Sequence, residues 1–163
     1  MANAIQVMAD GHNSVRIMCV QLPAIIDRFD EEKAAVRLVA LLRTHTTLEE
    51  ELVYPLLADR YPDLIDHAEV EHEAADRLLD EIESLPPRVK LRQTVALLWD
   101  NVQAHVKKEE REIWPLLTQM LDLAGLEALG RQMIGRQQEL MQQSVDTVGA
   151  AAIGRLQSIY PKL

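Results

Sequence analysis

Apolar residues recur three and four positions apart over most of the chain, the spacing that gathers side chains on one face of an α-helix. No segment of the sequence alternates between apolar and polar residues as a half-buried strand does. The pattern predicts four long helices, over about residues 4–29, 31–60, 63–84 and 89–120. Asp30 is the expected N-cap of the second helix, while Pro62 and Pro86 with Pro87 mark the later breaks.

Four long helices with short connections favour an all-α fold in which the helices run up, down, up and down in a four-helix bundle. We expect residues 1–121 to form this bundle and residues 122–163 to form a C-terminal helical extension packed on the same domain. Gly149 is expected to interrupt the extension before a short terminal helix. The extension has an apolar stripe made of Leu126, Leu129, Met133 and Leu140.

Polar side chains interrupt the apolar faces of all four predicted bundle helices. His12 lies on the inner face of the first helix and His72 on that of the third. The inner face of the second helix reads Leu38, Leu42, His45, Glu49, Leu52 and Leu56. That of the fourth reads Val95, Leu98, Val102, His105, Glu109, Ile113 and Leu116. Each helix thus directs at least one side chain that can bind a metal ion toward the core.

The chain also repeats itself at an offset of 60 residues. Residues 45–57 and residues 105–117 both contain His-x3-Glu and are identical at six of thirteen positions. The same offset carries His12 onto His72, so each copy has a His followed 33 residues later by His-x3-Glu. Two similar half-sites in one small chain are what a pseudo-two-fold site for two metal ions requires.

Buried carboxylates make this repeat informative, because an unpaired buried carboxylate costs several kcal/mol even after relaxation. No Lys or Arg lies on the inner faces, so bound cations are the natural compensation. A single inward His is usually a hydrogen-bonded core residue, and a single His-x3-Glu is a weak signal because Glu is common in helices. Repetition of the whole arrangement favours a dinuclear site, and imidazole and carboxylate suit iron, zinc or copper. The predicted ligands are His12, His45, Glu49, His72, His105 and Glu109.

Three further glutamates and one further histidine lie near these motifs. Glu50 and Glu110 are repeated, yet we expect them to be solvated or half-exposed. Glu69 lies three residues before His72 and could supply a seventh ligand, whereas His67 is expected on the surface.

Tyr54 follows the first His-x3-Glu motif, and Trp114 is its counterpart in the second copy. The tyrosine could donate a hydrogen bond or an electron near the metal ions. The interpretation that we favour is an aromatic ring packed beside Pro55.

Composition limits the partners. A net charge of -9 argues against binding to nucleic acid or to an anionic membrane surface, because phosphates are neutralised by Lys and Arg. Cys19 is the one cysteine, which excludes a disulfide within the chain, and we expect it to be a small buried residue. The N-terminus lacks a basic start and an apolar run of secretory type, so we expect a cytoplasmic protein.

The histidine and glutamate pattern, with YP and WP after the two motifs, resembles the hemerythrin-like or HHE cation-binding domain over about residues 10–120. The resemblance implies a non-haem di-iron centre in a four-helix bundle, with an oxo or hydroxo bridge between the ions. His12 and His45 would ligate one iron, and His72 and His105 the other. Glu49 and Glu109 would bridge the pair.

The chain departs from the oxygen-carrying members of that family. Ala68 stands where they have a further histidine, and the fourth helix carries His-x3-Glu where they carry His-x4-Asp. The resemblance therefore favours reaction with dioxygen, peroxide or nitric oxide, or sensing of them, over simple oxygen storage. Enzymatic turnover stays open, as do manganese or a mixed-metal centre and the identity of any protein partner. The alternatives are an iron- or oxygen-responsive binding module without turnover and, ranked lower, a structural zinc bundle.

Overall fold

The structure is a computed structural model that describes the backbone of residues 2–26 and 31–159 and the side chains of residues 2–22 and 33–143. The predicted end of the first helix at residue 29 and the predicted N-cap at Asp30 lie outside these ranges.

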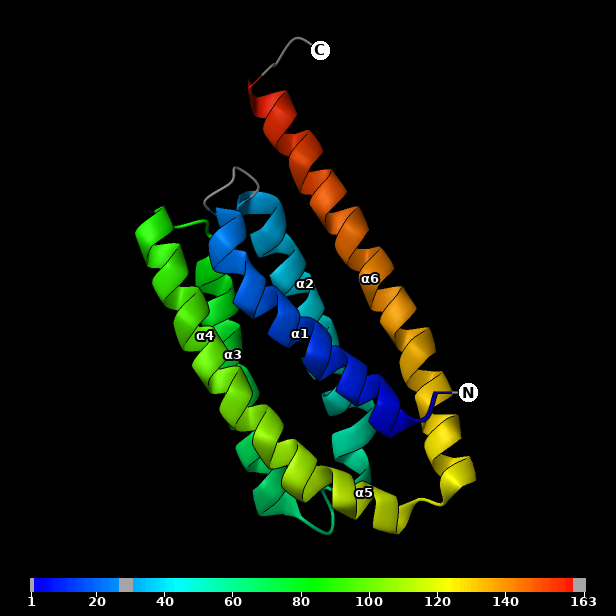
Figure 1. Ribbon diagram of the computed structural model, residues 1–163. Coiled ribbons are helices and arrows are strands. Elements are labelled where there is room, and N and C mark those ends of the chain that lie inside the picture. The colour runs from blue at the N-terminus through cyan, green and yellow to red at the C-terminus, as the bar shows by residue number, and fades with distance from the viewer. Residues whose placement is uncertain (1, 27–30, 160–163) are drawn as a thin grey trace.

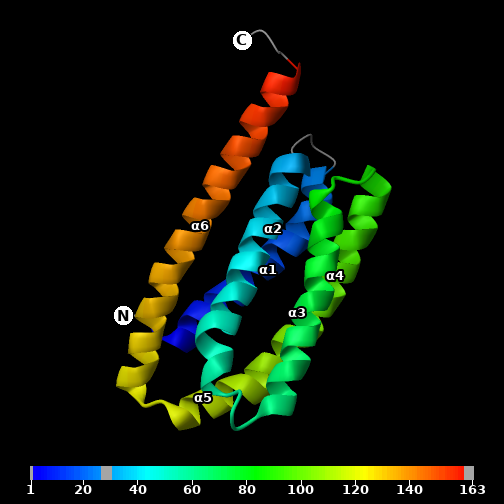
Figure 2. The ribbon, with the colours of Figure 1, turned by 180° about the vertical axis from the view of Figure 1, so that it is seen from behind.

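Four helices form the bundle that the sequence predicts (Figures 1 and 2). They are α1 (Ala4–Ile26), α2 (Glu31–Leu48), α3 (Pro62–Glu83) and α4 (Arg88–Lys108). Neighbours run in opposite directions, and α1 packs against α2, α2 against α3, α3 against α4 and α4 against α1. The described residues contain no strand, so the all-α prediction is confirmed.

The second and fourth predicted helices are each interrupted by a π-helical turn that begins at the glutamate of the His-x3-Glu motif. A π-helical turn, η1 (Glu49–Val53), follows α2 and leads into a 3₁₀ turn, η2 (Tyr54–Leu56). A second π-helical turn, η3 (Glu109–Ile113), follows α4 and leads into α5 (Trp114–Met120). Pro55 and Pro115 explain both, because a proline has no N–H to donate and its ring clashes with the carbonyl of the preceding turn. The π-turns were not predicted from the sequence. The fourth helical run ends at Met120, as predicted, whereas the second ends at Leu56, before the predicted residue 60.

The π-turn changes which residues face the core. An extra residue in a turn rotates every later side chain by about 100°. Leu56 was predicted to face inward but is 40% exposed, while its neighbours Val53 and Leu57 are buried. Leu117 takes the inner position expected for Leu116 in the same way.

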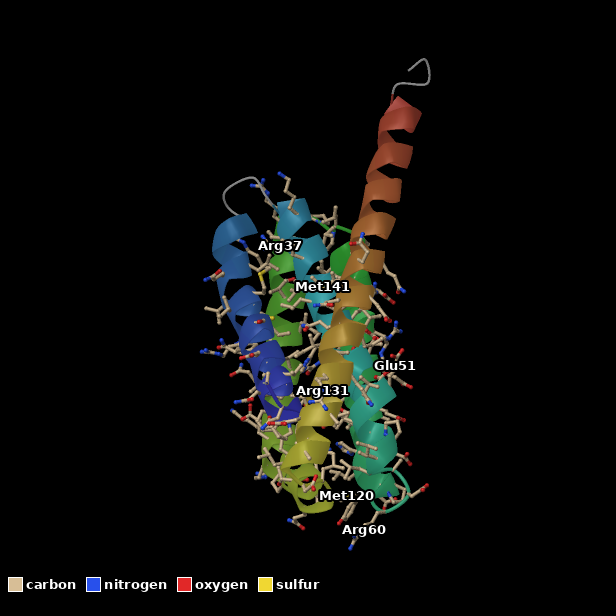
Figure 3. All side chains as sticks on the ribbon, turned by 90° about the vertical axis from the view of Figure 1, so that its right-hand side faces the viewer. Arg37, Glu51, Arg60, Met120, Arg131 and Met141 are labelled. Carbon is tan, nitrogen blue, oxygen red and sulfur yellow. The ribbon has the colours of Figure 1, made fainter. Side chains whose placement is uncertain are left out.

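The C-terminal part of the chain forms one long helix, α6 (Leu123–Ile159). It continues through position 149, so the predicted interruption at Gly149 was wrong. It crosses the face formed by α1 and α2 (Figure 3) and buries Leu126, Leu129 and Met133. Gly130 allows a close approach, since a Cβ atom there would lie 2.7 Å from the backbone oxygen of Ala2.

Beyond these contacts, the far end of α6 extends past the bundle (Figure 1). The division of the chain at residue 121 stays a prediction.

Two apolar clusters fill the bundle, one toward each end. The upper cluster includes Val15, Leu42 and Val102, and the lower cluster includes Met8 and the buried residues of α6. Each inner helix face passes from one cluster to the other through a buried histidine. The fold therefore places a polar layer between two apolar ones.

Candidate metal centre

The polar layer brings together all six side chains that the sequence predicts as ligands. Each is buried, and Glu49 and Glu109 are 0% and 1% exposed. Donor atoms that lie within 4.8 Å of one another fall into two groups. The first contains His12, His45, Glu49 and Glu109, and the second contains Glu49, His72 and His105.

Glu49 lies between the two histidine pairs. Its Oε1 is 3.1 Å from Nε2 of His45 and 3.6 Å from Nε2 of His12, while its Oε2 is 3.5 Å from Nε2 of His72. Neither oxygen makes a hydrogen bond within the described part of the chain, and neither does Nε2 of His45. Since the 3.1 Å contact lacks hydrogen-bond geometry, Glu49 is a fully buried carboxylate without a satisfied partner.

Glu109 uses its two oxygens differently. Its Oε2 lies 3.1 Å from Nε2 of His12 and 3.4 Å from Nε2 of His105. Its Oε1 accepts a hydrogen bond of 2.8 Å from the hydroxyl of Tyr54. One oxygen thus faces both histidine pairs and the other is turned to the tyrosine.

Three of the four buried histidines donate from Nδ1 to a carboxylate. His12 donates to Glu110 over 3.2 Å, and His72 donates to Glu50 over 2.7 Å. Both acids are about half-exposed, as predicted. Their contact with the histidines was not predicted. Such partners fix the orientation of an imidazole and raise its strength as a metal ligand.

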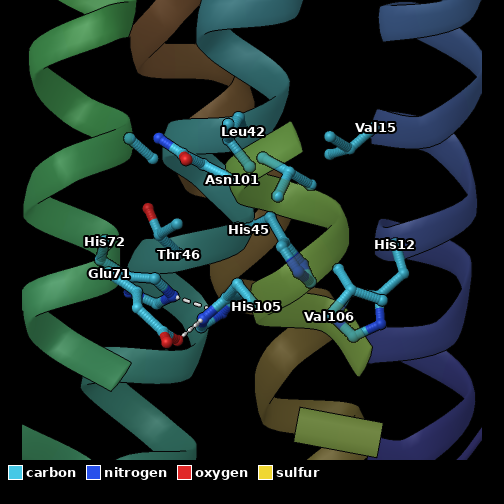
Figure 4. Close-up of a pocket in the computed structure, with 12 residues that line it drawn as sticks. His12, Val15, Leu42, His45, Thr46, Glu71, His72, Asn101, His105 and Val106 are labelled. Carbon is cyan, nitrogen blue, oxygen red and sulfur yellow. Dashed lines mark hydrogen bonds and ion pairs between the residues drawn. The ribbon is translucent and has the colours of Figure 1, made fainter. Parts of the chain in front are cut away.

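The third carboxylate is Glu71, whose Oε2 accepts from Nδ1 of His105 over 2.8 Å (Figure 4). Under the 60-residue offset, Glu71 corresponds to Gly11 and His105 corresponds to His45. Gly11 packs directly on the His45 ring, where a Cβ atom would lie 2.5 Å from Nδ1. The Nδ1 edge of His45 therefore packs against the backbone of Gly11, whereas the same edge of His105 faces the carboxylate of Glu71.

The two aromatic residues after the motifs each lie against a histidine. Tyr54 stacks on His72 with ring centroids 5.4 Å apart, and Trp114 stacks on His12 at 5.3 Å. The Tyr54 hydroxyl is also 3.2 Å from Nε2 of His72. Packing beside Pro55 was therefore an incomplete account of Tyr54, because its hydroxyl reaches the centre.

Electrostatics separate the histidines into two kinds. Burial disfavours a charge on His12, but the hydrogen bond with Glu109 and the negative charges of Glu49 and Glu109 outweigh it and raise the pKa of His12 to about 10. The same balance, led by Glu109, raises the pKa of His105 to about 9. Burial and the positive charge of His12 lower the pKa of His45 to about 3.

The carboxyl groups also differ. Burial, with the nearby charge of Glu109, raises the pKa of Glu49 to about 7. Burial acts on Glu109 in the same sense, but hydrogen bonds from His105 and His12 outweigh it and hold the pKa of Glu109 well below its usual value. Burial and the charges of Glu49 and Glu109 raise the pKa of the Tyr54 phenol.

A small cavity adjoins the four histidines on the side of the upper apolar cluster (Figure 4). Its volume of about 20 Å³ gives room for one molecule the size of water. The apolar part of its wall consists of Val15, Leu42, Ala75, Val102 and Val106.

The remaining sequence hypotheses fare differently. Glu69 is exposed and belongs to neither group of possible ligands, so the seventh-ligand hypothesis gains no support. His67 is exposed, as predicted, and its Nε2 lies 3.2 Å from Oε1 of Glu71. Cys19 is buried, as predicted, and burial raises the pKa of its thiol to about 12. The roles of Glu71 and Gly11 were missed, although their places directly before His72 and His12 could have suggested a comparison.

Known proteins place this arrangement in a family. Residues 3–117 match the family model of the hemerythrin HHE cation-binding domain, and the chain belongs to that family. No curated protein matches the chain significantly. A solved structure with a similar fold is that of a hemerythrin HHE cation-binding domain-containing protein from Mycobacterium kansasii. It superposes with a TM-score of 0.79 at 22% identity and covers 91% of this chain and 93% of that one.

The family and the geometry together define a cation-binding helical bundle whose buried His and Glu side chains are able to hold a metal ion. Within the described ranges, no helix combines the length and apolar character needed to cross a bilayer.

Proposed function

We propose that the protein is a non-haem di-iron protein that binds or reacts with dioxygen, peroxide or nitric oxide in a stress response or in sensing. In this proposal each histidine pair holds one iron, the two central carboxylates bridge them, and an oxo or hydroxo group completes the bridge. The ligands are His12, His45, Glu49, His72, His105 and Glu109.

The observation that carries the proposal is the position of Glu49. A fully buried carboxylate without a hydrogen bond is strongly unfavourable unless a positive charge compensates it. Its two oxygens face different histidine pairs, as a bridge between two ions requires. Four neutral imidazoles and two carboxylates form a donor set that suits iron.

Iron bound there would supply a redox-active centre with positions open to small ligands. The chain's own residues select what can reach it. The adjoining cavity is too small for an organic substrate and has mostly apolar walls, which suits a diatomic molecule or peroxide. The carboxylates Glu50, Glu71 and Glu110 hold three of the imidazoles in place by accepting hydrogen bonds from their Nδ1–H groups.

A surface groove of about 340 Å³ between α1 and α4 offers a route to this cavity. The groove and the cavity share His12 and Val106 in their walls. Small molecules would pass this point on their way to the centre.

The test is the iron content of untagged protein from iron-replete cells, together with two matched variants. We expect about two irons per chain in the parent, a strong loss in Glu49→Ala, and no loss in Glu51→Ala. Glu51 is a suitable control because it lies in the same turn but is exposed and paired with Arg136. Near-zero metal in a folded parent protein, or equal retention in both variants, would refute the proposal.

A binding or sensing module without turnover is the second candidate. It is favoured by the long α6, which packs on the bundle near η1 and extends beyond it, where it could report on the state of the centre. Purified protein that decomposes peroxide or reduces nitric oxide would favour an enzyme. Reversible binding without turnover, and helicity that is lost without iron and regained with it, would favour the sensor.

A further inference from the structure

The surface groove between α1 and α4 is much larger than the small ligands of the proposed function require. Its volume of about 340 Å³ compares with about 20 Å³ for the cavity beside the histidines. Sites for small organic molecules begin at about 300 Å³, so the groove has room for one. Its lining is also more polar than that of the cavity, with charged and amide side chains from both helices.

Two cations line this groove without a carboxylate partner. Arg16 of α1 and Lys107 of α4 are exposed, and neither forms an ion pair within the described residues. The guanidinium of Arg16 donates a hydrogen bond of 2.6 Å to Oδ1 of Asn13, which orients it and leaves further N–H groups for a ligand. Glu110 is the acid in the lining, but its carboxylate accepts the hydrogen bond from His12. The groove therefore carries more positive than negative charge.

An aromatic ring and an amide complete the lining that a ligand would contact. Trp99 packs against the upper cluster and also lines the groove, so part of its indole is available to a flat ligand. Gln103 lies one turn further along α4 and is half-buried, and its amide makes no hydrogen bond within the described part of the chain. A ligand with an anionic end and a planar apolar body would match the two cations, the amide and the indole.

We propose that the groove binds a small planar organic carboxylate, whose charge contacts Arg16 and Lys107 and whose ring contacts Trp99. The net charge of -9 opposes this binding only at long range, because salt screens charges beyond about 8 Å at physiological ionic strength. A bound ligand would lie beside Val106 and His12, which the groove shares with the cavity, and would restrict the entry of small molecules to the centre. That consequence rests on the proposed function, whereas the binding itself does not.

Calorimetric titration with benzoate tests the site, with benzamide and cyclohexanecarboxylate as probes that lack the charge or the planar ring. We expect saturable binding of benzoate, with affinity about tenfold lower for benzamide and about threefold lower for cyclohexanecarboxylate. Arg16→Gln and Lys107→Gln should each weaken benzoate binding about tenfold, the usual cost of a lost hydrogen bond to a charged group. Lys90→Gln is the control and should change nothing, since Lys90 lies on the same helix but is paired with Glu81.

Two substitutions at Trp99 test the ring contact while keeping an apolar side chain against the upper cluster. Trp99→Phe should keep the preference for benzoate over cyclohexanecarboxylate, and Trp99→Leu should lose it.

Four results would overturn the proposal. They are no saturable binding of benzoate up to about 10 mM, equal binding of benzamide, benzoate affinity unchanged in both Arg16→Gln and Lys107→Gln, and the ring preference retained in Trp99→Leu. A folded parent protein without iron that binds benzoate would refute the di-iron proposal and leave this site standing. Two irons per chain without benzoate binding would do the reverse.

Discussion

The half of the centre built from His12 and His45 differs from the half built from His72 and His105 at positions that the repeat makes equivalent. Gly11 in the first half corresponds to Glu71 in the second. Trp114 likewise stacks on His12 where Tyr54 stacks on His72 and adds a hydroxyl. The same pair of imidazoles is presented in both halves, but its support is different.

This difference shows how a repeated motif can give two unlike positions. A duplicated pattern fixes the residues that point inward, since these follow the helical period. The groups that contact the Nδ1 edge of each imidazole are set by single residues that lie outside the motif and differ between the two copies. His45 and His105 are equivalent in the repeat, yet the pKa of the first is lowered to about 3 and that of the second is raised to about 9.

The largest expected effect comes from filling the space at Gly11. In Gly11→Ala the new Cβ would lie 2.5 Å from Nδ1 of His45, so the imidazole must leave its place. We expect metal content to fall from about two ions to about one per chain, measured by elemental analysis. Gly135→Ala is the control, because nothing lies within 4 Å of the added methyl group. In that variant both ions should remain, and the helix should gain about 0.5–1 kcal/mol.

A Gly11→Ala protein that keeps both ions would show that His45 is not needed for the first position.

The next effect comes from the carboxylate that only the second half has. Glu71→Gln removes the charge behind His105 and should weaken binding of one ion by about 10–100-fold, the usual cost of losing such a partner. Competition with a chelator measures this weakening, because one ion per chain should be released before the other. Glu69→Gln is the control, since Glu69 is exposed on the same helix. An equal loss in both variants would restore Glu69 as a ligand candidate and remove the special role of Glu71.

In the metal-free protein, the different pKa values of the histidines should make the stability of the fold depend on pH. The folded pKa values of His12 and His105 are raised to about 10 and 9, so their contribution to apo stability is fully present below the unfolded value near 6.5. It is lost as pH rises through the folded values, and Glu49, raised to about 7, acts in the same direction. His45 has a lowered pKa, and its contribution is lost as pH falls from about 6.5 toward 3.

We therefore expect the melting temperature of the apo protein to fall between about pH 6.5 and 10. The metal-loaded protein should instead lose stability in mild acid, because histidine ligands must be neutral to bind a metal ion. Thermal unfolding of both forms over this range measures the two slopes. A flat apo profile would contradict the raised pKa values, and a loaded form unaffected down to about pH 5 would contradict imidazole ligation.

The sequence predicted the bundle and the gathering of the six inner polar residues, because both depend on helical periodicity alone. It could not predict the π-turns, which arise from the conflict between Pro55 or Pro115 and the preceding helix. It also missed the roles of Glu71 and Gly11, because both act on residues 34 positions away across the bundle. For Tyr54 the stacking position follows from the motif, but the contact with Glu109 depends on which way one carboxylate turns.

The smallest expected effect concerns the lysine behind Glu71. Lys108 lies 3.4 Å from Glu71, and its counterpart in the first half is the buried Leu48. Partly exposed ion pairs contribute about 0–1 kcal/mol, so Lys108→Leu should lower the free energy of unfolding by no more than that. Glu71 would keep its hydrogen bond with His105, and chelator competition should change by less than about threefold, within the same energy range. A change as large as that of Glu71→Gln would mean that the lysine, and not the carboxylate alone, sets the difference between the two halves.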